Sequence, residues 1–424
     1  MSTNIRTALA DNVYFNEIHV DRFKTMRLTA IALLPLEKDT AADFALLTQV
    51  LSRSCEEYPD FTTLSKKLSA LYGASLSAGV RKMGENLALT FSIAGIDDRY
   101  ALDGDVVSRE LSELLLKVMF EPKFTDGVFD TEEVEQERRQ LIDLADSELN
   151  DKRVYANARL IELMCKGEAY GIKRYGSRES ILECTPGSLK KAWERMLRGA
   201  RFEIFCVGGA SCDSAKATFK EKFSMVTRTP ESLHTEIVPM ANEVNRVEET
   251  MDIAQAKMLM GFRTNCSSGD EGTVAMRLMN VILGSGTRSK FFLNIREAQS
   301  LCYYCFSRYN RNKGILTVES GVENSNTQRT VDAVLHELEE VKKGNFTDED
   351  LRLAKLSVAS DFVSLTDAVT GNEEWFVSQL MDPEFLTVEE TTEKFNAVTR
   401  EDIIEAANKL TLDTVYILSG KEEL

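Results

Sequence analysis

The chain repeats itself, and this repeat constrains its fold more than any other feature. Residues 113–141 and residues 336–358 each contain an amphipathic helix, a short break, Phe-Thr-Asp and a second long, charged helix. Phe124 and Phe346 begin the two Phe-Thr-Asp copies. Threonine and aspartate are suited to capping the helix that follows, so both copies predict a helix start at the same point.

Two further pairs of segments match between the halves. Residues 86–95 and 314–322 both alternate apolar and polar side chains, as half-buried strands do. Residues 187–209 and 400–420 both read as an amphipathic helix followed by a buried strand that ends at glycine. Each half therefore predicts an α+β fold, with an antiparallel-rich sheet covered by helices on one face.

The repeat also predicts the domain organisation. We expect an N-terminal domain over residues 1–211, a polar linker over 212–245 and a homologous C-terminal domain over 246–424. Two similar domains can enclose a cleft, and clefts between domains are preferred ligand sites.

Charge and hydropathy restrict the partners of the chain. The formal net charge is −17, and no dense Lys/Arg block occurs. Nucleic acids and anionic membrane surfaces are therefore unfavourable partners. The sequence contains no run of about 18 apolar residues that would predict a membrane span, and no signal peptide is evident. We therefore expect a cytoplasmic location.

The cysteines favour reduced, buried thiols. Cys302-Tyr-Tyr-Cys305 is the one CxxC, and it lies in an apolar, strand-like stretch without a second CxxC at zinc-finger spacing. Two buried reduced thiols are the favoured interpretation, and a redox or metal-binding pair is the alternative. The other thiols are expected to stay reduced in the cytoplasm.

Common catalytic motifs are absent from the sequence. His19, His234 and His336 are the only histidines, and they are too far apart in the chain to form a His-x-x-x-His pair. The glycine-rich stretch 284–290 follows a helix-like segment instead of a strand, so we interpret it as a helix stop with Gly284 or Gly286 in a left-handed conformation. Residues 41–54 predict a core helix without catalytic side chains.

The stretch "GSGTRSKFFLNIREAQSLCYY" and the two tandem α+β domains resemble the M16 (pitrilysin/insulinase-like, processing-peptidase) superfamily, in particular its YmfF-like bacterial branch. The second domain of that superfamily typically carries Gly-Gly-Gly, Ser-x-Leu-Phe, Arg-Glu and Gly-Leu-x-Tyr in this order. The matching residues are Gly284, Gly286, Ser289, Phe292, Arg296, Glu297, Leu301 and Tyr303. "LYGA" at 71–74 also fits the YmfF-like branch, and the resemblance covers essentially the whole chain.

The resemblance implies a degenerate zinc site. Active members carry His-x-x-Glu-His on the first helix of the first domain, and the matching positions are Ala45, Thr48 and Gln49. These residues cannot bind zinc as imidazoles do, and Thr48 cannot act as a general base. The distant glutamate ligand of the family would match Glu135 or Glu137, which we expect to be surface residues here.

The resemblance also implies that Arg296 and Tyr303 bind the peptide backbone of a substrate near the scissile bond. Without it, Arg296 would be interpreted as half of an ion pair, and Tyr303 as a core or edge-strand aromatic whose hydroxyl reaches a partner. The preferred hypothesis is the non-catalytic, substrate-binding subunit of a heterodimeric zinc peptidase. A sister subunit with an intact zinc motif would hold the metal, and this chain would need no cofactor.

Two alternatives remain open at this point. The first is a structural or scaffold homologue without a proteolytic role. The second is a self-sufficient metallopeptidase whose non-standard site is built from scattered histidines and acids.

Overall fold

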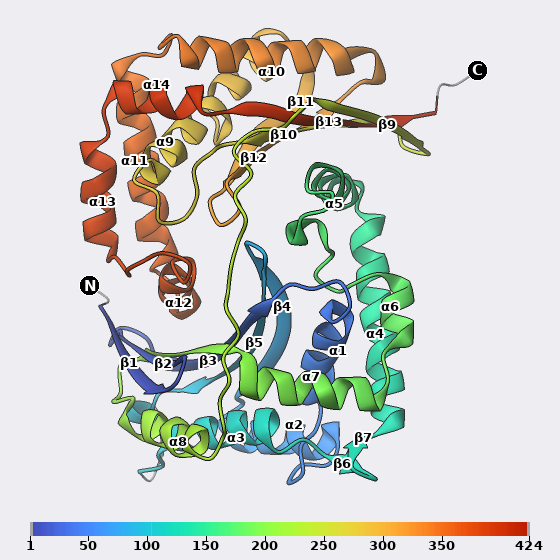
Figure 1. The fold of residues 1–424 in the computed structure, drawn as a ribbon. Helices are drawn as coiled ribbons and strands as arrows, with labels where there is room; N and C mark the ends of the chain where they lie inside the picture. Colours follow the sequence, from blue (N-terminus) through green and yellow to red (C-terminus); the bar gives the residue numbers. More distant parts are fainter. Residues whose placement is uncertain (1–2, 103, 422–424) are drawn as a thin grey trace. The chain divides into compact units, whose positions relative to one another are not determined.

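The structure, a computed structural model, describes residues 3–102 and 104–421 (Figure 1). These residues form two compact units. Unit 1 comprises the described residues up to Ser147 together with Ile172–His234 and Leu365–Leu380. Unit 2 comprises Glu148–Gly171, Thr235–Ser364 and the described residues from Met381 onward.

Unit 1 contains the first sheet and its helices. Its strands are β1 Asn4–Ala10, β2 Val13–His19, β3 Thr25–Pro35, β4 Ser75–Met83, β5 Asn86–Ile96, β6 Phe124–Thr125, β7 Val128–Phe129 and β8 Arg201–Gly208. Its helices are α1 Ala41–Leu51, α2 Phe61–Ala70, the short η1 Asp98–Tyr100, α3 Val107–Phe120, most of α4 Thr131–Asn150, α6 Arg178–Glu183, α7 Pro186–Gly199, α8 Asp213–Ser224 and α12 Val369–Val377.

Unit 2 contains the second sheet. Its strands are β9 Asn245–Met251, β10 Ala256–Arg263, β11 Cys302–Asn310, β12 Ile315–Val322 and β13 Thr411–Gly420. Its helices are α5 Lys152–Met164, η2 Ala169–Gly171, α9 Thr273–Gly284, the π-helix η3 Phe291–Ala298, η4 Asn324–Asn326, α10 Thr327–Lys342, α11 Asp348–Leu365, α13 Val388–Ala397 and α14 Arg400–Asn408.

The two sheets share one topology, which confirms the α+β fold and the repeat. The strand order is β1-β2-β8-β3-β5-β4 in unit 1 and β11-β12-β10-β13-β9 in unit 2. Read in the opposite direction, the second order matches the first strand by strand, from β9 with β2 to β11 with β4. The pairs β2–β8 and β9–β13 are parallel, and the other pairs of the two sheets are antiparallel.

Helices cover both faces of each sheet, so the prediction of one covered face was wrong. The central strand β3 shows the reason, because its residues from Leu28 to Leu34 are all buried, whichever face they point to. A strand buried on both faces needs packing partners on both. In unit 1 the helices α1, α3 and α7 pack on one face, and α12 contacts β3 and β8. In unit 2, α5 packs on β10 and β13, on the side opposite α10 (Figure 1).

The helices on the second faces are exchanged between the halves of the chain. Helix α5 comes from the first half but belongs to unit 2, whereas α12 comes from the second half but belongs to unit 1. Both helices occupy the same place in the repeat, directly after the long helices α4 and α11. The domains predicted as continuous halves are therefore interleaved at this point.

Polar contacts fix each exchanged helix on its sheet. On α5, Arg153 Nε donates to Glu319 Oε1 of β12 at 2.7 Å, and Arg159 Nε donates to Glu249 Oε1 of β9 at 2.7 Å. On α12, the Glu373 carboxylate accepts from Arg27 Nε at 3.0 Å and from the Thr29 hydroxyl at 2.9 Å, both on β3. The helix supplies the cations in unit 2 and the anion in unit 1.

Unit 1 extends beyond the boundary predicted at residue 211. Part of the predicted linker forms α8, whose Phe219 and Phe223 are buried in the core of unit 1. The ring of Phe219 lies 6.1 Å from that of Phe15, and the ring of Phe223 lies 4.9 Å from that of Phe202. These aromatic contacts keep α8 in unit 1, and the irregular connection is confined to residues after it.

The Phe-Thr-Asp copies behave differently in the two halves. In the second half, Thr347 caps α11 as predicted, because its hydroxyl accepts from the Asp350 N–H while Asp350 Oδ2 accepts from the Thr347 N–H. In the first half, the motif forms β6 and the start of the turn of the β6–β7 hairpin, so it does not lie at the start of α4. Asp130 caps α4 instead, since its Oδ1 accepts from the N–H groups of Glu132 and Glu133.

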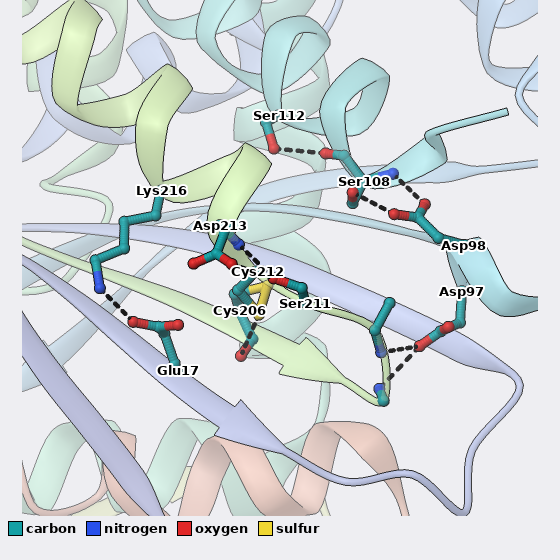
Figure 2. Close-up of a disulfide and its surroundings, with 12 residues drawn as sticks. Glu17, Asp97, Asp98, Ser108, Ser112, Cys206, Ser211, Cys212, Asp213 and Lys216 are labelled. Carbon is teal, nitrogen blue, oxygen red and sulfur yellow. Dashed lines mark hydrogen bonds and ion pairs between the residues drawn. A yellow bond between two sulfur atoms is a disulfide. The ribbon is translucent and has the colours of Figure 1, made fainter.

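One pair of cysteines departs from the expected reduced state. Cys206, near the end of β8, and Cys212, just before α8, form a disulfide with a Cα–Cα distance of 6.3 Å (Figure 2). The turn between them is held by Asp97, whose Oδ2 accepts from the N–H groups of Gly209 and Ala210 (Figure 2). This turn reverses the chain and brings the two sulfur atoms together.

A buried charge network holds the segment after α5 in unit 2. Glu168 accepts from Arg263 Nη2 at 2.6 Å and pairs with Lys313 Nζ at 2.6 Å. Arg263 also pairs with Asp413 Oδ2 of β13 at 2.8 Å. Burial raises the pKa of Glu168, but the hydrogen bonds from Arg263 and Lys313 outweigh it and hold the pKa below the ordinary value of 4.5.

Glu168→Gln is expected to lower the free energy of unfolding by about 3 kcal/mol, because two buried cations lose their anion. A carboxyl group whose pKa is lowered by folding stabilises the fold above its unfolded pKa and loses this effect as the pH falls below it. The difference between wild type and variant should therefore shrink below pH 4.5. Urea unfolding at several pH values measures it, and Glu349→Gln in the exposed Arg352–Glu349 pair is the control. If both variants lose the same small amount of unfolding free energy, the Glu168 network does not stabilise unit 2 as described.

Candidate functional site

The predicted zinc-motif positions lie on α1, in the core of unit 1. Ala45 and Thr48 are buried, and Gln49 is half-buried. The Thr48 hydroxyl donates to the backbone oxygen of Ala45 at 2.8 Å. The helix therefore uses these positions for packing and a local hydrogen bond.

The carboxylate that could have completed a metal site is already paired. Glu137 on α4 is buried, and its Oε1 lies 2.9 Å from Nη1 of Arg53, just after α1. Burial raises the pKa of Glu137, and the charge of Arg53 opposes this effect. Glu135 pairs with Arg138 on the same helix. The prediction of two surface residues was wrong for Glu137, since the guanidinium allows its charge to be buried.

The histidines do not assemble a site. His19, His234 and His336 are all exposed, and they lie at the end of β2, in the connection after α8 and on α10. Within the described ranges, no group of three or more His, Cys, Asp or Glu side chains could hold a metal ion. These described residues therefore do not fit the zinc that active members of the M16 superfamily bind.

Arg296 lies on the π-helix η3 of unit 2. Its side chain is 41% exposed, and its Nε lies 3.7 Å from Glu297 Oε1. The guanidinium also lies over the ring of Phe292, 4.7 Å from the ring centroid. The neighbouring glutamate leaves most of the fork of donors available to a ligand.

Tyr303 lies on β11, at one edge of the sheet. The pairing register shifts between Cys302 and Tyr304, because Cys302 pairs with Val322 whereas Tyr304 pairs with Gly321. Tyr303 is the extra residue of this β-bulge, and it is 58% exposed. Its hydroxyl forms no hydrogen bond to any residue that the structure describes. A bulge turns a side chain away from its regular direction, and here it leaves the phenol exposed.

The glycine-rich stretch connects α9 to these residues. Gly286 has a φ of +97°, as the interpretation as a helix stop requires. Gly284 is the last residue of α9. A Cβ at this position would lie 2.4 Å from Ser307 Oγ on β11 and 2.5 Å from the Phe291 ring on η3, so both elements approach the end of α9 closely. Ser289 Oγ accepts from the Phe292 N–H at 3.3 Å and so helps to start η3. The motif residues before Arg296 are thus structural.

Unit 2 brings the two predicted binding residues onto neighbouring elements, because η3 packs against β11. Ala45, Thr48 and Gln49 belong to unit 1. The bulge at Tyr303 could not be predicted from the sequence, since a bulge depends on the pairing with β12. The Arg53–Glu137 pair could not be predicted either, because it joins residues far apart in the chain.

Comparisons with known proteins agree with this description. Residues 183–358 match the family model described as the peptidase M16 inactive domain. The chain is 29% identical over 96% of its length to a "Probable inactive metalloprotease YmfF" of Bacillus subtilis, covering 95% of that protein. The chain is thus similar to members of the M16 peptidase family.

Solved structures share the whole fold. A conserved protein from Enterococcus faecalis has a TM-score of 0.91 at 27% identity, with 99% of both chains covered. A peptidase M16 inactive domain from Pseudomonas fluorescens has a TM-score of 0.79 at 19% identity, covering 99% of this chain and 98% of that one. The chain therefore has the same fold as these two proteins, and its sequence contains no His-x-x-Glu-His motif.

Hydropathy adds one finding about membranes. None of the helices in the described part of the chain is both long and apolar enough to cross a bilayer.

Introducing the glutamate of the zinc motif at position 48 should destabilise the fold. Thr48→Glu is expected to lower the free energy of unfolding by about 3 kcal/mol or more, because it buries a charge that has no partner. Gln49→Glu, at the half-buried neighbouring position, should cost less than about 1 kcal/mol. Urea denaturation of both variants tests this expectation. Similar losses in the two variants would show that position 48 is accessible to solvent.

Proposed function

We propose that this chain is the non-catalytic, substrate-binding subunit of a heterodimeric M16-type zinc peptidase. Arg296 and Tyr303 bind the backbone of a peptide or small protein, and a sister M16 subunit with an intact His-x-x-Glu-His motif supplies the zinc. The observation that carries the proposal is the contrast between the two sets of motif residues. The zinc-motif positions Ala45 and Thr48 are buried, whereas Arg296 and Tyr303 are exposed.

Arg296 is suited to hold peptide carbonyl groups. Its planar fork of N–H donors can bind two acceptors in fixed geometry. The contact with the Phe292 ring supports the guanidinium from one side without using its in-plane donors. The separation from Glu297, 3.7 Å, is too long for a strong hydrogen bond.

Tyr303 is suited to donate one hydrogen bond to a substrate. An exposed phenol without a protein partner can donate its proton to a carbonyl oxygen that gains negative charge during peptide hydrolysis. Arginine and tyrosine would then bind and orient the substrate. The zinc of the partner subunit would supply the activated water.

Reconstitution of the pair tests the proposal. The chain alone should not cleave a fluorogenic peptide, and mixing it with a sister subunit that carries the zinc motif should produce cleavage. Arg296→Ala and Tyr303→Phe in this chain should each lower kcat/KM of the pair by about 10²-fold, the usual effect of removing one donor near an oxyanion.

Two controls separate binding from structure. Arg308→Ala removes an exposed arginine from β11, the strand that carries Tyr303. Tyr100→Phe removes an exposed hydroxyl in unit 1. Both variants should leave turnover unchanged. If Arg296→Ala and Tyr303→Phe also leave it unchanged, the proposed role is wrong. An assembled pair that cleaves nothing and binds no peptide would instead identify a scaffold subunit, and zinc bound to this chain alone would identify a self-sufficient enzyme.

A further inference from the structure

The Cys302–Cys305 pair lies beside the proposed binding residues and has no role in the proposed function. In a regular strand, residues three apart point to opposite faces and their Cα atoms lie about 10 Å apart. Such a pair could not form a disulfide, whose Cα atoms lie about 4.4–6.8 Å apart. The CxxC pattern in a strand would therefore predict two unrelated thiols.

The β-bulge at Tyr303 changes this geometry. Cys302 pairs with Val322 and Cys305 pairs with Ser320, so the two cysteines lie opposite strand positions that are only two residues apart. Positions two apart share one face of the sheet and lie about 7 Å from each other. Both cysteines are buried and both are free thiols in the structure.

The surroundings shift the pKa values of the two thiols in opposite directions. The hydrogen bond from Cys305 lowers the pKa of Cys302 to about 7 despite burial, with help from the Ser320 hydroxyl and the positive charge of Arg296. The hydrogen bond to Cys302, together with burial, raises the pKa of Cys305. Cys302 is 9% exposed and Cys305 is 5% exposed. Cys302 therefore has the features of the attacking thiolate, and Cys305 those of the resolving thiol.

We propose that Cys302 and Cys305 are a redox modification site, at which a peroxide forms a reversible disulfide across the bulge that carries Tyr303. This site goes beyond the proposed function, because its chemistry requires neither a peptide nor a partner subunit. The oxidant is a small peroxide, which can reach a sulfur atom on an edge strand more easily than a protein oxidant can.

The reaction balances in two steps. The Cys302 thiolate attacks one oxygen of hydrogen peroxide, an S–O bond forms, the O–O bond breaks, and the released hydroxide takes a proton to become water. Cys305 then loses its proton and attacks the sulfur of the Cys302 sulfenic acid. The S–S bond forms, the S–O bond breaks, and a second water leaves. The two thiols are oxidised by two electrons, and one peroxide is reduced to two waters.

The sequence provides a clean readout. Trypsin cleavage after Arg296 and Arg308 yields the peptide 297–308, which contains Cys302 and Cys305 and no other cysteine. After treatment of the full chain with hydrogen peroxide and alkylation under denaturing conditions, this peptide should lack both alkyl groups and be lighter by two hydrogens than the unmodified peptide. The free-thiol count should fall by two, and dithiothreitol should restore it.

Single variants assign the two roles. In Cys305→Ser, peroxide should leave a Cys302 sulfenic acid that dimedone traps, because the resolving thiol is missing. In Cys302→Ser, dimedone should label Cys305 at least ~10-fold less, because that thiol is protonated at neutral pH. Cys55→Ser, which removes a buried free thiol in unit 1, is the matched control and should still form the disulfide. A peptide 297–308 that keeps two alkylatable thiols after peroxide, or equal labelling of the two single variants, would overturn the proposal.

A consequence for peptide binding rests on the proposed function. The disulfide would draw the two cysteines closer and tighten the bulge between them, which carries the Tyr303 side chain. The affinity of the oxidised chain for a fluorescent peptide should therefore differ at least ~3-fold from that of the reduced chain, and the Cys302→Ser variant should show no such change. Disulfide formation with unchanged affinity would refute this coupling while leaving the modification site in place. If neither form binds peptide, the proposed function fails independently of the disulfide.

Discussion

Burial of the central strands on both faces is the constraint on which the rest of the structure depends. The residues in the middle of β3 are buried on both faces of the sheet. Nearly all residues of β10 are also buried. One layer of helices cannot cover such a sheet, so each unit needs a helix on its second face. Helices α5 and α12 meet this need, and each comes from the half of the chain that forms the other unit. The exchange explains why neither half of the repeat, taken as a continuous segment, forms a complete unit.

The polar contacts of the exchanged helices follow from the same constraint. A helix placed on a buried face must satisfy any charged side chain that it brings with it. Arg153 and Arg159 of α5 meet the carboxylates of Glu319 and Glu249, and Glu373 of α12 meets Arg27. The Glu168 network continues this arrangement directly after α5. The Glu168 network is the largely buried one, and breaking it by removing one partner would leave an uncompensated buried charge, which fixes the position of the segment after α5.

The two copies of the repeated fold present different side chains. At the positions that match the zinc motif, helix α1 carries Ala45, Thr48 and Gln49, of which the first two are buried in the core, and Arg53 pairs with the buried Glu137. In unit 2, the π-helix η3 and the bulged edge strand β11 hold Arg296 and Tyr303 at the surface. One scaffold can thus carry different functional groups in its two copies, because the packing that forms the fold does not depend on the exposed side chains.

The sequence alone determined the repeat, the α+β class, the helix stop at Gly286 and the loss of the zinc motif, because these depend on local periodicity, turn chemistry and residue identity. The tertiary structure decided the exchange of α5 and α12, the place of α8 in unit 1, the Cys206–Cys212 disulfide and the burial of Glu137, because each depends on a contact between residues far apart in the chain or across a turn. The bulge at Tyr303 shows the difference most clearly. The sequence Cys-Tyr-Tyr-Cys determines which side chains are present. Only the pairing of β11 with β12 exposes Tyr303 and places both sulfur atoms on one face of the sheet.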